Sequence, residues 1–265
     1  MHNFTYSRPT SVADAVKALG ASEARAIAGG QTLLPTLRAR LAEPSALVDL
    51  GAIAELKGIK AEGGGITIGA GTTHAEVAAS ADVKKTIPAL AALAGGIGDR
   101  QVRNRGTIGG SLANNDPAAD YPAAVLALGA TVKTNKRTIA ADSFFKGLFD
   151  TALENGELIT SVSFPIPAKA GYSKFPHPAS RFALTGVFVV KTKAGDVRVA
   201  ATGASQSGVM RVGAIENALK ANWAASALDS IKVADTGLMA DMHGSAPYRA
   251  NLIKVMAQRA VQAAG

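Results

Sequence analysis

Two glycine-containing segments of the sequence have the composition of ligand-binding loops. The first runs from Ala28 to Pro35 and reads AGGQTLLP, and the second runs from Thr107 to Asp120 and reads TIGGSLANNDPAAD. Glycines let the backbone approach a ligand closely, and free N–H groups at the start of a helix favour a phosphate. The second segment adds hydroxyl, amide and carboxylate groups that can bind phosphate oxygens or ligand hydroxyls. Two such loops that converge on one ligand fit a pyrophosphate better than a mononucleotide.

The residues alone leave a second interpretation of these segments open. Neither segment has glycines at the first, third and sixth positions, as the dinucleotide fingerprint requires, and neither ends in lysine and Ser or Thr, as the phosphate loop of nucleoside triphosphatases does. A bare AGG turn is also what a tight connection between a strand and a helix requires. The first segment by itself is therefore consistent with a ligand loop or with a purely structural turn.

Composition limits the kind of chemistry that this chain can perform. The sequence has no cysteine, which excludes disulfides, thiolate metal sites, ordinary iron–sulfur clusters and a cysteine nucleophile. The four histidines are far apart, and none has a second histidine or a carboxylate at helical ligand spacing, so we expect no metal site. If the chain takes part in redox chemistry, an organic cofactor must carry it.

The charge pattern raises the question of partners. The formal net charge is +8, yet the basic residues are dispersed, and the one tight group, Arg100 to Arg105, has no aromatic residues interleaved with it. Stacking platforms for bases are therefore hard to find, and we expect no nucleic acid. The excess charge indicates a solvated surface or a docking face for acidic partner subunits.

The sequence contains no sign of membrane insertion or export. No apolar run approaches the roughly 20 residues of a membrane-spanning helix. The first residues, MHNFTYSRP, lack the basic start and the apolar core of a secretory signal. We therefore expect no membrane span and a cytoplasmic location.

Hydrophobic spacing and capping residues predict an alternation of helices and strands. Arg105 to Asp120 is rich in glycine and asparagine, and we expect it to be irregular. The prolines at 165 and 167 mark a boundary before a separate C-terminal α+β region, in which Ala194-Gly195-Asp196 is the turn of a hairpin. The predicted helices are Ser11–Leu19, Leu33–Leu41, Thr73–Ser80, Ala89–Ala94, Pro122–Leu128, Val212–Lys220 and Pro247–Ala264. The predicted strands are Arg25–Ala28, Ala46–Leu50, Ile66–Ile68, Thr131–Thr134, Arg137–Ala140, Leu158–Pro165, Gly186–Thr192 and Val197–Thr202.

The two glycine segments resemble the two FAD signatures of the medium subunit in the xanthine dehydrogenase, aldehyde oxidase and carbon monoxide dehydrogenase superfamily of molybdenum hydroxylases. The similarity covers nearly the whole chain, because FTYSRP at the start, IGAGTTH at 68–74, GELIT at 156–160 and the stretch from Lys174 to Gly186 occur there in the same order. The resemblance implies an α+β fold: a PCMH-type (vanillyl-alcohol-oxidase-like) FAD-binding domain of two α/β subdomains at residues 1–55 and 56–167, then a C-terminal α+β domain at residues 168–265.

The resemblance also implies a role for individual residues. Asp116 and Asp120 recognise hydroxyl groups, with Asp120 on the ribityl chain, while Leu158 or Ile159 lies against the isoalloxazine ring and Lys174 reaches the polar edge of the ring. No side chain is assigned a catalytic role. The residues expected around the pyrophosphate are Ala28, Gly29, Gly30, Gln31, Thr32, Leu33, Leu34, Thr107, Ile108, Gly109 and Gly110, with Ser111 and Asn115 beside them.

Other interpretations apply to single residues. His74 either touches the flavin or is a capping or surface histidine, and Lys174 has the alternative of a surface lysine whose aliphatic stem lies on apolar neighbours. Trp223, the only tryptophan, is expected to anchor domain packing. The chain also departs from some relatives, which have an acidic residue shortly after the position of Arg181, where this sequence continues Phe182-Ala183-Leu184-Thr185-Gly186.

The function implied by the resemblance is that of an electron-transfer subunit. A large partner would hold the molybdopterin cofactor, a small partner would hold two-iron iron–sulfur clusters, and the three would assemble as a dimer of heterotrimers. This chain would pass electrons through FAD to NAD, oxygen or a quinone-type acceptor. Two alternatives stay open: a self-contained flavin-dependent oxidoreductase of the same fold, and a nucleic-acid-binding protein that uses the Arg100 to Arg105 group.

Overall fold

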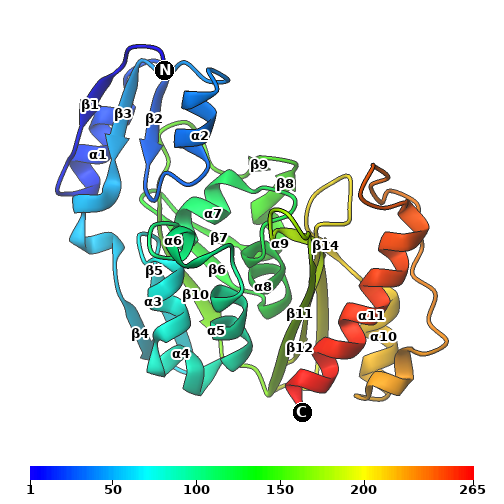
Figure 1. Cartoon of the computed structure of the whole chain (residues 1–265). Coiled ribbons are helices and arrows are strands. Elements are labelled where there is room, and N and C mark those ends of the chain that lie inside the picture. Colours follow the sequence, from blue (N-terminus) through cyan, green and yellow to red (C-terminus); the bar gives the residue numbers. More distant parts are fainter.

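A computed structural model describes residues 1–265 and contains three main sheets that lie side by side (Figure 1). The N-terminal sheet is parallel and has the order β1 (Thr5–Ser7), β3 (Ala46–Asp49), β2 (Ala24–Ile27). Helix α1 (Val12–Leu19) begins where the Ser11 hydroxyl accepts the N–H of Asp14. Helix α2 (Leu33–Arg38) connects β2 to β3, which confirms the predicted βαβ unit.

The central sheet is antiparallel and has five strands. Their order is β4 (Ile59–Glu62), β5 (Gly65–Gly69), β10 (Ile159–Pro165), β6 (Thr131–Thr134) and β7 (Thr138–Ala140). The short 3-10 helices η1 (Leu50–Ala52) and η2 (Ala54–Leu56) lead into it from the N-terminal sheet. Beyond β7, α9 (Ala141–Phe144) precedes a hairpin of β8 (Phe145–Gly147) and β9 (Asp150–Thr151).

Six helices lie between β5 and β6 in the sequence and surround the largest hydrophobic core. The predicted capping box is present, because Thr73 and Glu76 exchange hydrogen bonds at the start of α3. Every residue of α8 is buried, so this helix is enclosed within the molecule. The six are α3 (His74–Ala79), α4 (Ala81–Thr86), α5 (Pro88–Gly95), α6 (Arg100–Arg103), α7 (Ile108–Asn114) and α8 (Tyr121–Leu128).

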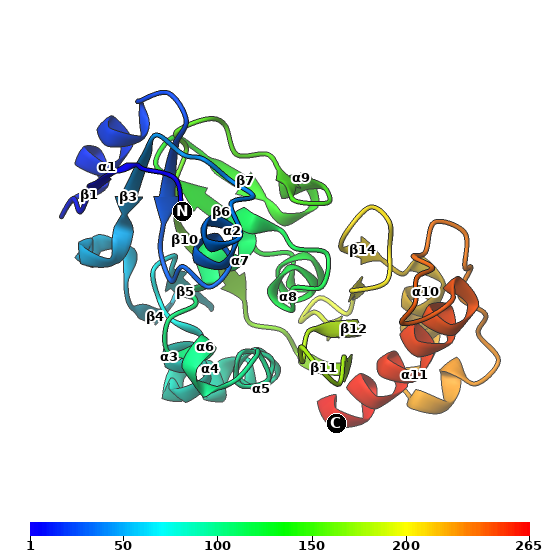
Figure 2. The same ribbon diagram turned by 45° about the horizontal axis from the view of Figure 1, so that its top comes forward.

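The C-terminal sheet is covered on both faces. Its antiparallel order is β11 (Lys169–Pro176), β12 (Ala183–Lys191), β13 (Val197–Thr202), β14 (Met210–Arg211), followed by α10 (Gly213–Ala221), η3 (Ala225–Leu228) and α11 (Ala246–Ala264). Successive side chains of a strand point to opposite faces. Val187 and Val189 therefore join the core beneath α10 and α11, whereas Phe188 and Val190 join the core around α8. Figure 2 shows α8 and α11 on opposite sides of this sheet.

Two predictions about elements are wrong. Residues 105–120 are not irregular throughout, because Ile108 to Asn114 forms α7, whose N-cap is Thr107 and whose C-cap is Asn115 in the left-handed conformation. Burial of Ile108 and Leu112, four residues apart on one face, outweighs the low helix propensity of the two glycines. Helix α2 ends at Arg38 and does not reach Leu41, which is exposed beyond a left-handed Arg40.

The other predicted helices and strands are present within a few residues of their expected limits, including the hairpin of β12 and β13. The pattern missed β1, β4 and β11, the short helices α4, α6 and α9, the three 3-10 helices, and the small strands β8, β9 and β14. The division at residues 55 and 167 stays a prediction. The central core crosses the second limit, since Phe188, Val190 and Ala200 belong to it.

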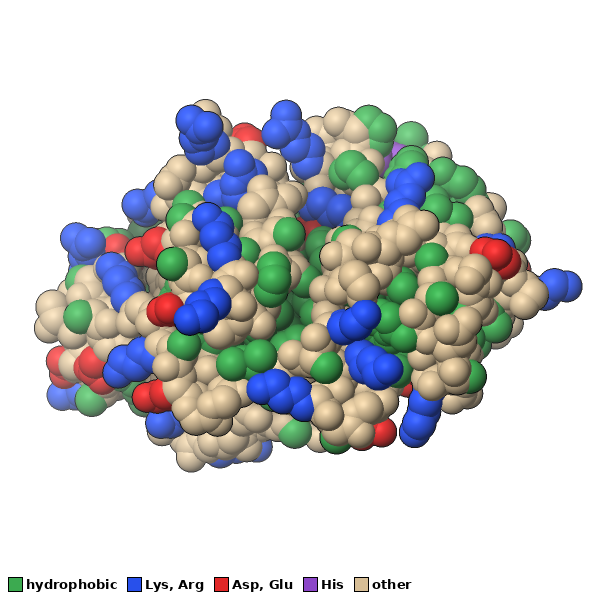
Figure 3. Space-filling model, turned by 90° about the horizontal axis from the view of Figure 1, so that it is seen from below, with side chains coloured by type: hydrophobic (Ala, Val, Ile, Leu, Met, Phe, Trp, Pro, Cys, Tyr) green, Lys and Arg blue, Asp and Glu red, His purple; other side chains and the backbone are tan.

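Surface charge and helix composition complete the description. Seen from below, Lys and Arg side chains are spread over the molecule and separated by uncharged atoms (Figure 3). None of the helices has the combination of length and apolar composition that a membrane-spanning helix needs.

Candidate functional site

A cavity with a volume of about 1130 Å³ is lined by segments that lie between Arg8 and Phe182 in the sequence. Its walls come from the loop between β2 and α2, the start of α7, the loop between α7 and α8, the start of β10, and the turn between β11 and β12. Pockets for drug-sized ligands usually measure about 300–1,000 Å³. The cavity therefore has room for a long ligand such as a dinucleotide.

The loop between β2 and α2 presents an uninterrupted run of free donors. None of the backbone N–H groups from Gly29 to Leu33 donates a hydrogen bond within the chain, and all of these residues line the cavity. Gly30 has a φ of 72°, a left-handed conformation that turns the backbone around the cavity. Successive free N–H groups in such a turn form an anion-binding nest. This observation favours the ligand-loop interpretation of AGGQTLLP over a purely structural turn.

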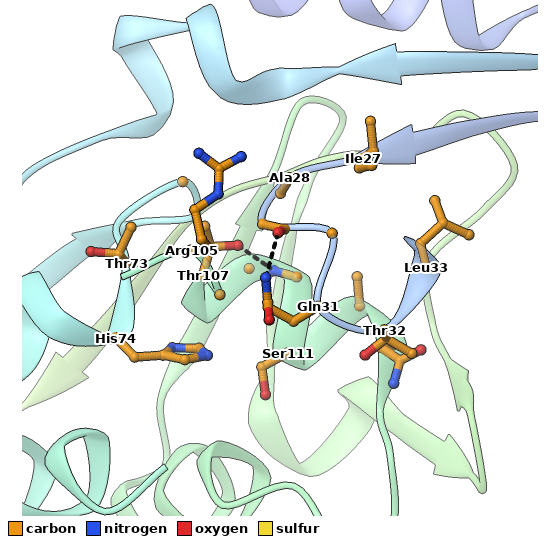
Figure 4. A pocket seen from close by; sticks show the side chains of 18 of the residues that line it. Ile27, Ala28, Gln31, Thr32, Leu33, Thr73, His74, Arg105, Thr107 and Ser111 are labelled. Atoms are coloured by element: carbon orange, nitrogen blue, oxygen red, sulfur yellow. Dashed lines mark hydrogen bonds between the residues drawn. The ribbon is translucent and has the colours of Figure 1, made fainter. Parts of the chain in front are cut away.

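The start of helix α7 contributes side chains and no free backbone N–H groups. The N–H groups at its start are already used, because Ile108 donates to the Thr72 carbonyl, Gly109 to the Ala70 carbonyl and Gly110 to the Thr107 hydroxyl. Ser111 and Asn114 line the cavity, and their side chains have no hydrogen-bond partner within the chain. In Figure 4 Gln31 and Ser111 lie next to the same space, with His74 on its other side.

Two of the glycines serve the packing of the loops against each other. A Cβ on Gly29 would lie 2.1 Å from the Arg105 carbonyl oxygen, and a Cβ on Gly109 would lie 2.5 Å from the Ala70 Cβ. Both distances are far below a van der Waals contact. The absence of a side chain therefore lets Gly29 lie against the backbone just before the second glycine segment, and lets Gly109 lie against Ala70, which follows β5.

Asp120 is the centre of a buried polar network at the cavity wall. It is 4% exposed, accepts a hydrogen bond of 2.5 Å from the Tyr172 hydroxyl, and lies 2.9 Å from the Lys174 ammonium nitrogen. Burial raises the pKa of Asp120, while Lys174 and Tyr172 act in the opposite direction. The C-terminal sheet thus holds this carboxylate through two side chains of β11.

Apolar and acidic residues of the β10 region form the opposite part of the lining. Leu158 and Ile159 are buried and line the cavity next to Glu157. The pKa of Glu157 is lowered to about 2, chiefly by the hydrogen bond from Arg137 and further by those from the Glu154 N–H and the Thr134 hydroxyl. Burial acts in the opposite direction. This anchor fixes the start of β10, and therefore the two apolar side chains.

Most of the predicted site residues are brought together at this cavity, with four exceptions. Ile108 is fully buried in the core, and Leu34 is 38% exposed away from the lining. Asn115 is 2% exposed and binds other backbone groups, since its amide donates to the Gly147 and Asp150 carbonyls at 2.8 Å each. Lys174 approaches the site only through Asp120. The lining includes Ala28, Gly29, Gly30, Gln31, Thr32, Leu33, Thr107, Gly109, Gly110, Ser111, Asp116, Asp120, Leu158 and Ile159.

The sequence did not identify the cations at the cavity. Arg25, Arg105 and Arg181 line it, and no side-chain hydrogen bond or ion pair within the chain engages their guanidinium groups. The carboxylates that line it are mostly engaged by partners in the chain, such as Glu76 in its capping box and Asp120 with Lys174. The three guanidinium groups are therefore available to an anionic ligand. Arg105 lies two residues before the second glycine segment, and this position is the one signal that could have identified it.

His74 is a buried wall residue and not a surface histidine. It is 5% exposed, lines the cavity, and has its ring 5.4 Å from the Tyr121 ring. Burial, together with the charge of Arg103, lowers the pKa of His74 to about 4. The imidazole is therefore neutral at pH 7.

The arrangement fits FAD. The nest of free N–H groups and the free guanidinium groups suit a pyrophosphate, Ser111 and Asp120 offer a hydroxyl and a carboxylate for ligand hydroxyls, and Leu158 and Ile159 offer an apolar wall. The buried carboxylates Asp120 and Glu157 are bound to the cations Lys174 and Arg137. The site is built to bind and orient a cofactor.

Comparisons with known proteins agree with this geometry. Residues 2–167 match the family model described as the FAD binding domain in molybdopterin dehydrogenase. The nicotine 6-hydroxylase medium subunit of Paenarthrobacter nicotinovorans is 36% identical over 274 residues, covering 98% of this chain and 96% of the relative. The carbon monoxide dehydrogenase medium chain of Hydrogenophaga pseudoflava is 35% identical over 277 residues, covering 98% and 96%.

A solved structure extends the similarity to the whole fold. A chain of the reconstituted CO dehydrogenase from Oligotropha carboxidovorans superimposes with a TM-score of 0.90 and 34% identity, covering 99% of this chain and 97% of that one. Sequence and fold thus agree from one end of the chain to the other. The chain belongs to the family of FAD-binding medium subunits of molybdenum hydroxylases.

Proposed function

We propose that this chain is the medium subunit of a heterotrimeric molybdenum hydroxylase and passes electrons from iron–sulfur clusters, through FAD, to an external acceptor. The observation that carries the proposal is the run of free N–H groups from Gly29 to Leu33 on a cavity of about 1130 Å³, in a chain of this family. A large partner would hold the molybdopterin cofactor, and a small partner would hold two-iron clusters. The assembly would be a dimer of heterotrimers in the cytoplasm.

The composition of the chain supports the need for partners. It has no cysteine to bind an iron–sulfur cluster. The relatives that match over nearly their full length are named medium subunit and medium chain, which places each of them among larger and smaller subunits. The net charge of +8 suits docking against acidic partner surfaces.

Individual residues take the following roles in this proposal. The N–H groups from Gly29 to Leu33 bind the pyrophosphate, and Arg105 adds a cation next to them. Asp120, held by Tyr172 and Lys174, accepts hydrogen bonds from ribityl hydroxyls. Leu158 and Ile159 form the apolar wall against the ring and exclude water from that side. FAD, when bound, accepts electrons and releases them to NAD, oxygen or a quinone-type acceptor.

The first experiment is an absorbance spectrum of the purified chain before and after denaturation, with chromatography that separates FAD from FMN. We expect released FAD at close to one per chain. Absence of flavin, with no uptake when the chain is incubated with FAD, would contradict the proposal. An Arg105→Ala variant is expected to bind FAD more weakly and with less dependence on salt, because it removes one exposed cation near the phosphates.

A second experiment tests the assembly. The chain is tagged in its native host and purified, and the complex is analysed for molybdenum, iron and subunit composition. We expect two further subunits, one with molybdenum and one with iron. A chain that purifies alone with FAD and oxidises a substrate by itself would instead identify a self-contained flavin-dependent oxidoreductase.

A further inference from the structure

The turn between β11 and β12 forms one wall of the cavity. Its residues 179–182 line the cavity, although they lie far in the sequence from the two glycine segments. The turn is closed by two backbone hydrogen bonds of 2.8 Å, from the His177 N–H to the Phe182 carbonyl and from the Arg181 N–H to the His177 carbonyl. Arg181 has a left-handed φ of 63°. The shape of this wall therefore depends on what keeps the turn in place.

The His177 imidazole stabilises the turn from inside. Its Nδ1 accepts the N–H groups of Ala179 and Ser180, at 3.2 and 3.4 Å. A ring nitrogen that accepts carries no proton, so the proton of the neutral ring is on Nε2. That nitrogen lies 3.1 Å from Nδ1 of His243, with the two rings at 84° to each other. In this arrangement His177 donates to His243.

His243 is in turn attached to the buried part of the C-terminal region. Its N–H donates to Asp241 at 2.8 Å, and the other oxygen of Asp241 accepts from Arg249 at 2.7 Å. Arg249 is 2% exposed and also donates to the Leu184 and Gly203 carbonyls, at 2.7 Å each. A continuous series of contacts therefore leads from α11 to the cavity wall.

We propose that His177 and His243 form a pH-sensitive latch, which holds the β11–β12 turn against the cavity while both rings are neutral and releases it when either ring is protonated. A proton on Nδ1 of His177 would place a donor against two N–H donors. A proton on Nδ1 of His243 would place two donors against each other, and protonation of both would bring two cations together at 3.1 Å. Histidine changes its charge between about pH 5 and 8.

The charged groups around the two histidines are either already engaged or permanently charged. Asp241 is already engaged by Arg249 and by the N–H groups of His243 and Gly244. Arg181, on the same turn as His177, is a permanent cation and adds to the repulsion of a protonated ring. A bridging metal is not favoured, because no third His, Asp or Glu joins the pair and Nδ1 of His177 accepts, which leaves the proton on Nε2.

Hydrogen exchange of the purified full-length chain tests the latch without any bound flavin. Exchange of residues 177–182 is measured at pH 8 and pH 5.5, corrected for the intrinsic pH dependence, with a chelator present. We expect corrected exchange to be at least about fivefold faster at pH 5.5, as loss of one hydrogen bond would produce. The turn at Ala194-Gly195-Asp196, at the other end of β12 and without histidine, is the internal control and is expected to show no change.

Two variants separate titration from simple structural loss. In His177→Asn the amide oxygen takes the place of Nδ1 and accepts the same N–H groups, but the bond to His243 is lost, so protection of the turn should be partial and equal at both pH values. In His177→Ala the turn should exchange rapidly at both. Equal protection of the wild-type turn at both pH values, an unchanged pH response in His177→Asn, or loss of protection at pH 8 on adding the chelator would overturn the proposal.

The effect of the latch on flavin binding rests on the proposed FAD function. It is measured separately, as the rate of flavin dissociation. In the FAD-loaded chain we expect flavin to dissociate faster at pH 5.5 than at pH 8 in the wild type, and at similar rates in His177→Asn. A chain that binds no FAD would contradict the proposed function but would leave the exchange experiment decisive for the latch. A chain that binds FAD and shows the same exchange in all variants would contradict the latch alone.

Discussion

Gly29 shows how one missing side chain can organise the whole site. Its backbone lies against that of Arg105 and Gly106, so that a Cβ would approach the Arg105 carbonyl carbon to 2.6 Å and its oxygen to 2.1 Å. No flexible side chain is available to move, because the contact is with backbone. The two glycine segments can face one cavity only as long as this contact is kept.

We therefore expect Gly29→Ala to separate the two segments. The variant should lose about 1–3 kcal/mol of unfolding free energy, the usual cost of overpacking, and should bind FAD far more weakly. Gly213→Ala is the matched control, since Gly213 begins α10 and a Cβ there would meet no atom within 4 Å. Urea unfolding and flavin titration measure both effects. Wild-type FAD affinity in Gly29→Ala would show that the contact between the segments does not shape the cavity.

His74 makes stability depend on pH with a definite sign. Folding lowers the pKa of His74 from 6.5 to about 4. Between these pH values His74 is protonated in the unfolded chain and neutral in the folded chain. Unfolding free energy should then fall as the pH falls from about 6.5 to about 4, by up to about 1.4 kcal/mol per pH unit. In His74→Gln this contribution should disappear, which urea unfolding at several pH values would detect. Parallel curves for the two proteins would show that His74 titrates normally.

At the scale of elements, α7 is the point where local pattern and tertiary packing disagree. Its sequence, IGGSLAN, has two glycines and an asparagine among seven residues, which is typical of a loop. The helix exists because Thr107 caps its start, Asn115 ends it at a φ of 44°, and Ile108 and Leu112 are buried. Of these three conditions, the burial of Ile108 and Leu112 is the one that depends on what surrounds the segment.

Other elements could be read from the sequence because their signals are local. The capping box at Thr73, the βαβ unit and the β12–β13 hairpin depend on neighbouring residues alone, and all are present. Strand β11 was missed because its side chains do not alternate clearly between buried and exposed. Likewise, the two glycine segments are found by composition, whereas the cations at Arg25 and Arg181 reach the cavity only through the fold.

Variants of Asn115 can distinguish a ligand role of this residue from a structural role. The resemblance implied a place beside the pyrophosphate, but the side chain holds the β8–β9 hairpin, and its carbonyl accepts the Phe149 N–H at 3.1 Å. We expect Asn115→Ala to cost about 2–4 kcal/mol, from two lost hydrogen bonds and a strained left-handed backbone. Asn115→Gly should cost less, because glycine accepts this φ. Reduced FAD affinity at unchanged unfolding free energy would indicate a direct ligand contact instead.

At the scale of the whole molecule, the C-terminal sheet completes a site that the family model assigns to residues 2–167. Tyr172 and Lys174 hold Asp120 from β11. From β13 the Thr202 hydroxyl lies within hydrogen-bond distance of the Pro117 and Ala119 carbonyls, at 2.9 and 2.7 Å. The loop that carries Asp116 and Asp120 is thus fixed by residues beyond the matched region. We therefore expect flavin binding to depend on the contacts between this loop and the C-terminal sheet.

Thr202 offers the most specific test of these contacts between the loop and the C-terminal sheet. It is fully buried, and Thr202→Val keeps its shape while removing the hydroxyl. The Pro117 carbonyl would keep the Gly203 N–H at 2.8 Å, but the Ala119 carbonyl would lose this hydrogen bond next to Asp120. We expect a loss of about 1–3 kcal/mol in unfolding free energy and weaker FAD binding, although Thr202 lies outside the cavity lining. Thr202→Ser keeps the hydroxyl and should restore most of the affinity. If Thr202→Val lowers stability but binds FAD as tightly as the wild type, the loop between α7 and α8 keeps its position without the C-terminal sheet.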